Sequence, residues 1–126
     1  MATVIDASAL LAYLQDEPGA VAVGDCLEVA CISSVNLAEV IQKAAQFGVE
    51  TIGLASELEA LGLGIEPFSA QQAEIAASLW PATRPFGLSL ADRACLALAI
   101  DRGSAVMTTD RAWGELRLDL AIDVIR

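Results

Sequence analysis

Short runs of apolar residues alternate along this chain with longer segments in which apolar residues recur at helical spacing. The short runs predict buried strands, which lie at residues 3–5, 30–32, 63–66, 105–108 and 121–124. The longer segments predict helices, which lie at residues 8–15, 20–28, 34–48, 51–61, 69–80, 90–102 and 111–116. Residues 81–88 contain two prolines and a glycine, which predict a loop.

Serine and glycine residues stand where these helices begin and end. Ser33 or Ser34, Ser69 and Ser89 are predicted caps of helix starts, and Gly103 follows the end of the helix at 90–102. Strands that alternate with helices are typical of βαβ units. We therefore predict an α/β fold, a three-layer α/β/α sandwich around a central, mostly parallel sheet. Residues 1–126 suit a single domain of this kind.

Four acidic residues fall where predicted strands end or where the adjoining helices begin. Asp6 directly follows the first strand, Glu39 lies in the second turn of a helix, and Asp110 follows the strand at 105–108. Asp92 begins a helix that runs antiparallel to the strands, so its N-terminus lies at their carboxyl ends. In such sheets ligands bind at that edge. The topology therefore predicts that all four carboxylates lie at one rim.

Carboxylates gathered at one rim repel one another, and their pKa values rise unless divalent cations neutralise them. All-oxygen ligation favours Mg²⁺, with Mn²⁺ as the alternative. The chain contains no histidine, which excludes a Ser-His-Asp triad and zinc sites that depend on imidazole. Any hydrolytic chemistry would therefore depend on carboxylates and metal.

Each acid also has a purely structural interpretation. Asp6 and Asp110 can each cap the helix that follows, and residues 89–92 match a capping box between Ser89 and Asp92. Glu39 precedes Lys43 by four residues, the favourable order for a surface ion pair on a helix. Capping explains one acid at a time and does not predict that the four converge.

Four segments of the chain, in this order, resemble the successive motifs of PIN-domain ribonucleases, and most of all VapC-type toxins of bacterial toxin–antitoxin pairs. They are residues 3–10 (TVIDASAL), 33–40 (SSVNLAEV), 88–92 (LSLAD) and 108–111 (TTDR). The resemblance implies that Asp6, Glu39, Asp92 and Asp110 hold Mg²⁺, with Ser8 or Thr108 as a nearby hydroxyl. It also implies endonucleolytic cleavage of RNA and inhibition by a cognate antitoxin.

The net charge of the chain affects its ability to bind RNA. Seventeen acids and seven bases give a net charge of −10, which repels phosphate and attracts cations or a basic partner. A simple nucleic-acid-binding module is therefore not favoured. Arg84, Arg93 and Arg111 lie in or beside the predicted rim, where they can contact RNA phosphates or merely balance nearby acids.

Partners and location follow from the remaining apolar residues. The helices between residues 20 and 61 carry more apolar residues than one small core needs, so we expect a second copy in a homodimer or a basic antitoxin segment to cover them. No apolar run approaches the roughly 18 to 20 residues of a membrane span. Three cysteines without Cys-x-x-Cys spacing favour a reducing cytoplasm.

Two other functions compete with a Mg²⁺-dependent endoribonuclease. One is a receiver-like signalling module whose acidic rim binds a metal or a phosphoryl group, and the other is a degenerate PIN domain that binds without cleaving. A receiver-like module would need adjacent acids after the first strand and a lysine after a late strand. The chain offers Asp6 alone and no lysine beyond Lys43.

Overall fold

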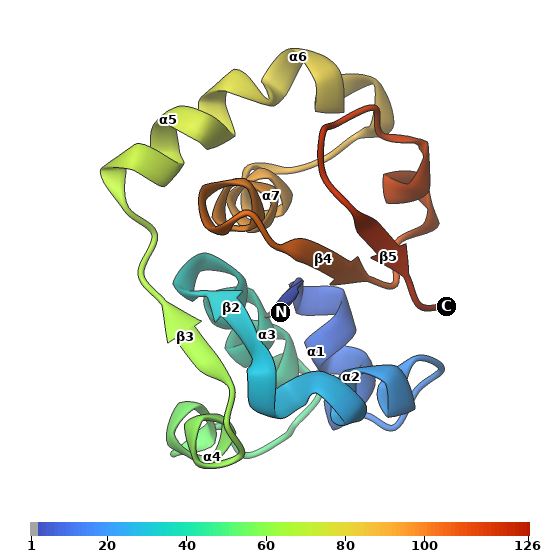
Figure 1. The fold of residues 1–126 in the computed structure, drawn as a ribbon. Coiled ribbons are helices and arrows are strands. Elements are labelled where there is room, and N and C mark those ends of the chain that lie inside the picture. Colours follow the sequence, from blue (N-terminus) through green and yellow to red (C-terminus); the bar gives the residue numbers. More distant parts are fainter. Residues whose placement is uncertain (1–2) are drawn as a thin grey trace.

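The computed structural model describes residues 3–126, and in them one parallel sheet of five strands forms the centre of the fold (Figure 1). The order across the sheet is β3-β2-β1-β4-β5, and every neighbouring pair is parallel. The strands are β1 (Thr3–Ile5), β2 (Ala30–Ser33), β3 (Gly64–Glu66), β4 (Ala105–Thr108) and β5 (Ile122–Val124). All carboxyl ends therefore meet at one edge of the sheet.

Helices cover both faces of the sheet, which confirms the predicted α/β class (Figure 1). On one face lie α1 (Ala7–Leu14), α2 (Ala20–Cys26), α3 (Ser34–Gln46) and α4 (Leu54–Ala60). On the other lie α5 (Ala70–Ser78), α6 (Trp80–Thr83) and α7 (Leu90–Arg102). Here α7 packs on β1, β2 and β4, and α5 packs on α7 from outside. Short 3₁₀ helices follow α2, α6 and β4, namely η1 (Leu27–Val29), η2 (Arg84–Phe86) and η3 (Arg111–Glu115).

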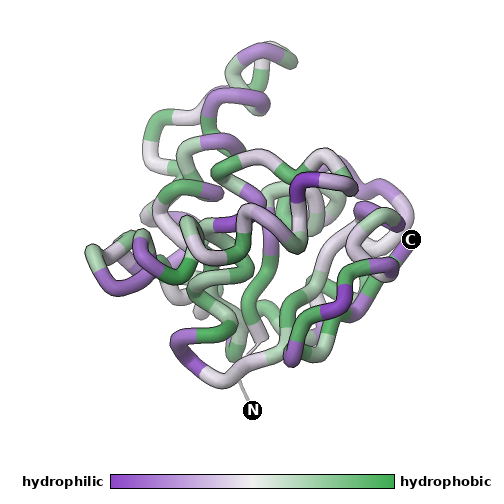
Figure 2. Tube along the Cα trace, turned by 90° about the horizontal axis from the view of Figure 1, so that it is seen from above, coloured by the Kyte–Doolittle hydropathy of each residue, from purple (hydrophilic) through white to green (hydrophobic). Residues whose placement is uncertain are grey.

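The strands are apolar on both sides, so the sheet divides the core into two clusters. Val4 and Val106 pack with α7, whereas the next residues along the same strands, Ile5 and Met107, pack with α1 and α3. This alternation follows from the two-residue period of a strand. Figure 2 shows hydrophobic and hydrophilic positions alternating along the outer helices, as helices with one buried face require.

The helix caps agree with the serine positions in the sequence. Ser33 Oγ accepts a hydrogen bond from the Val35 N–H, and Ser69 Oγ accepts one from the Gln72 N–H. Gly103, which ends α7, has a φ of +62°, a backbone conformation that glycine adopts without strain. Within residues 3–126, no helix combines the length and the apolar character that a membrane span requires.

Three segments differ from their sequence-based predictions. Residues 81–88, predicted as a loop, are helical for most of their length, because α6 and η2 occupy them. Pro81 and Pro85 stand in the first turns of these elements, where the missing N–H leaves no bond unmade. The helix predicted from residue 51 begins only at Leu54, after Gly53 with a φ of +80°. Residues 111–115 form a 3₁₀ helix where an ordinary helix was expected.

Candidate functional site

Asp6 is a buried carboxylate at the end of β1, with 4% of its surface exposed. It caps α1, since its Oδ1 accepts a hydrogen bond from the Ala9 N–H at 2.8 Å. The same oxygen accepts the Ser8 hydroxyl proton at 2.7 Å, and Oδ2 accepts that of Thr108 at 2.6 Å. The capping interpretation is therefore confirmed for Asp6, but the cap accounts for only one of its three hydrogen bonds.

The hydroxyls of Ser8 and Thr108 hold Asp6 between β1 and β4. Ser8 Oγ accepts a hydrogen bond from the Thr109 N–H, and Thr108 Oγ1 accepts one from the Asp110 N–H, each at 3.0 Å. Each hydroxyl thus directs its proton to Asp6 and a lone pair to the main chain that follows β4. The resemblance implied Ser8 or Thr108 as a nearby hydroxyl, and in the structure both donate to Asp6. Their contact with a substrate stays a prediction.

Burial raises the pKa of Asp6 from 3.8 to about 6. Hydrogen bonds from Thr108, Ala9 and Ser8 act in the opposite direction, and the charge of Asp92 adds a smaller increase. The predicted direction is therefore confirmed for Asp6, but repulsion between carboxylates, the predicted cause, contributes less to the rise than removal from water. A buried acid of this kind exchanges its proton close to neutral pH.

Glu39, in α3, is tied to the start of α7 by a residue that the sequence analysis did not single out. Asn36 Nδ2 donates to Glu39 Oε1 at 3.0 Å and to the Ala91 carbonyl at 2.9 Å. Asn36 is 1% exposed, and its Oδ1 has no hydrogen-bond partner among residues 3–126. Among the described residues no ion pair joins Glu39 to Lys43, so that interpretation is wrong. The missed signal was a polar residue at a core-facing position of an amphipathic helix.

Asp92 forms the capping box that the sequence predicted. Ser89 Oγ accepts from the Asp92 N–H at 3.1 Å, and Asp92 Oδ2 accepts from the Ser89 N–H at 2.9 Å. Asp110 likewise caps η3, its Oδ1 accepting from the Ala112 N–H at 3.0 Å. Both structural interpretations are therefore confirmed, and both carboxylates retain further lone pairs.

The four acids lie at the carboxyl edge of the sheet without forming a tight cluster. Within residues 3–126, no three Asp, Glu, Cys or His side chains are close enough together to hold a metal ion. Burial raises the pKa of the Cys95 thiol, and the charges of Asp6, Asp92 and Glu39 add to the increase, so all three acids act on this buried residue of α7. Asp110 joins them through the hydroxyl of Thr108.

The donor atoms at this edge suit Mg²⁺. They are carboxylate oxygens without imidazole, together with the buried amide oxygen of Asn36 that lacks a partner. Mg²⁺ prefers oxygen ligands, keeps several waters and needs only one or two protein carboxylates, so it does not require three acids in direct contact. The residues present therefore fit the predicted ion in their chemistry.

The three arginines predicted beside the rim have other contacts in the described residues. Arg93 Nη1 donates to the Ala76 carbonyl at 2.9 Å and so joins α7 to α5. The Arg84 guanidinium lies 4.8 Å from the centre of the Trp80 ring. The exposed Arg111 donates to the main-chain oxygen of Arg126 at 3.4 Å. Contact of these arginines with RNA stays a prediction.

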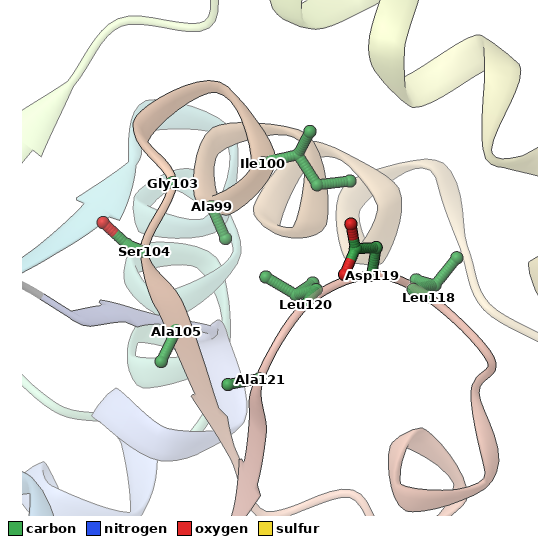
Figure 3. A pocket seen from close by; sticks show the side chains of 9 residues that line it. All are labelled: Ala99, Ile100, Gly103, Ser104, Ala105, Leu118, Asp119, Leu120 and Ala121. Carbon is green, nitrogen blue, oxygen red and sulfur yellow. The ribbon is translucent and has the colours of Figure 1, made fainter.

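A hollow of about 700 Å³ lies at the opposite edge of the sheet, beside the amino ends of β4 and β5 (Figure 3). Ile100, Leu118 and Leu120 line it together with small residues, and Asp119 is the one charged residue in its wall. None of the four acids takes part. The residues among 3–126 that line the hollow include no cation for a phosphate, and the hollow is separate from the candidate site.

Known proteins resemble this chain over most of its length. The family model of the PIN domain matches residues 3–117. The chain is similar to solved structures of FitAcB from Neisseria gonorrhoeae, with 24% identity over 98% of this chain and 96% of that chain and a TM-score of 0.73. DNA-bound VapBC from Salmonella typhimurium shares 20% identity over 98% of both chains, with a TM-score of 0.71. VapBC2 from Rickettsia felis, bound to a promoter DNA fragment, shares 18% over 98% of both, also with a TM-score of 0.71. No curated protein matches the chain.

Proposed function

Because the chain belongs to the PIN-domain family, we propose that it is a Mg²⁺-dependent endoribonuclease and the toxin of a toxin–antitoxin pair. The observation that carries the proposal is Asp6, a carboxylate that is 4% exposed and has a pKa of about 6 beside Asp92. Burying a carboxylate costs free energy unless a cation compensates for the lost water. For Asp6, hydrogen bonds from Ala9, Ser8 and Thr108 offset part of this cost, and a bound cation would offset the rest.

Asp6, Glu39, Asp92 and Asp110 would hold the ion. When bound, Mg²⁺ lowers the pKa of water, which makes a nucleophile available near neutral pH, and stabilises charge on the scissile phosphate. Ser8 and Thr108 keep the Asp6 carboxylate in one orientation, so little reorganisation is needed during the reaction. Attack by water would leave a 5′-phosphate and a 3′-hydroxyl. Arg84 and Arg111 would offset the net charge of −10 where RNA approaches.

The proposed partners are a cognate antitoxin and a second copy of the chain. Val21, Phe47 and Ile52 are 78%, 70% and 85% exposed, in agreement with the predicted excess of apolar residues between residues 20 and 61. An apolar recess of about 90 Å³ lies among neighbouring side chains that include Leu14 and Val49. One similar solved structure is described as a toxin–antitoxin complex, from Klebsiella pneumoniae. A basic, amphipathic antitoxin segment would complement this acidic and apolar surface.

Light scattering tests the homodimer, and co-purification with the product of the neighbouring gene tests the antitoxin. We expect the purified chain to show a mass above 13.1 kDa. A stable monomer would contradict the homodimer. Such a toxin acts in the cytoplasm, where the free thiols of Cys26, Cys31 and Cys95 stay reduced.

The decisive experiment compares RNA cleavage by the wild type, Asp6→Asn and Asp119→Asn, each with Mg²⁺ and with EDTA. We expect the wild type to cleave only with the metal and Asp6→Asn to lose roughly a hundredfold or more in rate, as when a group that stabilises the transition state is removed. Asp119→Asn should cleave normally, since Asp119 lies at the opposite edge. Undiminished cleavage in EDTA that follows the protein through purification would exclude this mechanism.

A thermal melt with and without Mg²⁺ makes the test independent of the RNA target. Mg²⁺ at a hundred times its dissociation constant should stabilise the wild type by about 2.7 kcal/mol. Asp6→Asn should show little of this effect. Specific metal binding without cleavage of any RNA would instead favour the degenerate, binding-only PIN domain.

A further inference from the structure

We infer that Asn36 is a positioning residue that holds Glu39 against the start of α7, so that Glu39 and Asp92 bind the same cation. The inference rests on the proposed function, because it concerns the same metal centre. It adds a residue of the segment 33–40 that is neither one of the four acids nor a helix cap. The geometry of its amide group carries the argument.

Both protons of the Asn36 amide are committed to the two helices that bear these acids. One goes to Glu39 Oε1 at 3.0 Å and the other to the Ala91 carbonyl at 2.9 Å, one residue before Asp92. Asn36 is 1% exposed, so its amide group is shielded from bulk water. The Glu39 carboxylate is therefore held at a set distance from the first turn of α7, although α3 and α7 are far apart in sequence.

Stability alone does not explain an asparagine at this position. Its neighbours on the buried face of α3 are Leu37 and Val40, so an apolar side chain would suit the surroundings. Its Oδ1 is buried without a partner, which disfavours the folded state. The Ala91 carbonyl would keep its helical partner, the Cys95 N–H, if Asn36 were replaced. The amide therefore brings a cost that a purely structural residue would avoid.

Gln72 provides a matched control within the same molecule. It is 4% exposed, its Nε2 donates to Asp101 Oδ2 at 3.2 Å, and its Oε1 is likewise buried without a partner. It also joins a neighbouring helix to α7. Asp101, however, is nine residues after Asp92, about 13 Å farther along the helix axis. Gln72 thus shares the chemistry of Asn36 but lies away from the four acids.

The test measures Mn²⁺ binding to the full chain by the EPR signal of free Mn²⁺, in the absence of RNA, and the stability of the metal-free protein in urea. The variants are Asn36→Leu, Asn36→Ala, Gln72→Leu, Glu39→Gln and the double variant Asn36→Leu with Glu39→Gln. We expect Asn36→Leu to weaken Mn²⁺ binding about tenfold, as loss of a group that orients a metal ligand does. Gln72→Leu should bind Mn²⁺ like the wild type. In the Glu39→Gln background, Asn36→Leu should add little further loss, because its effect acts through Glu39.

The outcomes separate this inference from the proposed function. A wild type that binds no Mn²⁺ would overturn both. A wild type that binds Mn²⁺ while both Asn36 variants bind it equally well would overturn only the role of Asn36. The role of Asn36 would also be overturned if Asn36→Leu and Gln72→Leu weakened Mn²⁺ binding equally. The same holds if the losses of Mn²⁺ binding from Asn36→Leu and Glu39→Gln were additive. Asn36→Ala, which cannot clash with its neighbours, keeps the test valid if Asn36→Leu does not fold.

Discussion

Asp6 and Asp92 are neighbouring carboxylates at one edge of the sheet, yet their surroundings differ. Asp6 is buried between β1 and β4 and accepts hydrogen bonds from two hydroxyls as well as from the main chain. Asp92 is half-buried in the first turn of α7, where its recorded partner is the Ser89 N–H. A capping acid stabilises the fold whether or not a metal is bound. A buried acid disfavours the metal-free fold when ionised, and a cation reverses this.

Asp110 and Glu39 extend the comparison. Asp110 is exposed and caps η3, so it resembles Asp92, whereas Glu39 is half-buried and is held by Asn36. The candidate site thus combines one deeply buried acid, Asp6, with three less buried acids, of which Asp92 and Asp110 cap helices and Glu39 is held by Asn36. Each of the following predictions separates the two kinds of acid by a different measurement.

The largest expected effect is the pH dependence that Asp6 gives to the metal-free protein. Its pKa is 3.8 in the unfolded chain and about 6 in the fold, so the folded state binds the proton more tightly. The unfolded chain ionises first as pH rises, and stability falls between about pH 4 and pH 6 by about 3 kcal/mol. Asp6→Asn should lack this fall, because an amide does not ionise while its oxygen can still cap α1.

Urea denaturation in EDTA from pH 4 to pH 7 measures this difference. Other acids titrate in the same range, so the informative quantity is the difference in unfolding free energy between the wild type and Asp6→Asn. Asp119→Asn serves as the control and should follow the wild type. Parallel curves for the wild type and Asp6→Asn would contradict the burial argument.

A smaller effect is expected from Thr108→Val, which removes a buried hydroxyl with little change of shape. Asp6 loses a donor and the Asp110 N–H loses an acceptor, so we expect a loss of about 2 kcal/mol in stability. Because the Thr108 bond lowers the pKa of Asp6, the pH at which stability falls should also move upward. Urea denaturation across the same pH range measures both effects. Thr83→Val, which removes a buried hydroxyl elsewhere, should leave that pH unchanged.

The smallest effect distinguishes the cap from the charge at Asp92. Asp92→Ala should cost about 1 kcal/mol, because the Ser89 N–H loses its partner and the start of α7 loses a negative charge. Asp92→Asn keeps an acceptor oxygen and should lose less. Both should respond more weakly to Mg²⁺ in thermal melts. A wild-type response to Mg²⁺ in both variants would mean that Asp92 only caps α7.

Local features of the sequence were sufficient for most elements and for the position of the acids. Apolar runs located the strands, and serines located the starts of α3, α5 and α7. Parallel strand order then predicted which edge carries the acids, since this follows from chain direction alone. The loop predicted at residues 81–88 was wrong because proline is as acceptable in the first turn of a helix as in a loop.

Contacts between distant segments were decided only by the tertiary structure. The bond from Asn36 to Ala91 joins residues 55 positions apart, and that from Thr108 to Asp6 joins residues 102 apart. No periodicity or motif specifies such a bond, because it depends on how helices and strands pack. The same holds for the cause of the raised pKa of Asp6: the sequence contained this carboxylate, but the burial that raises its pKa exists only once the chain has folded.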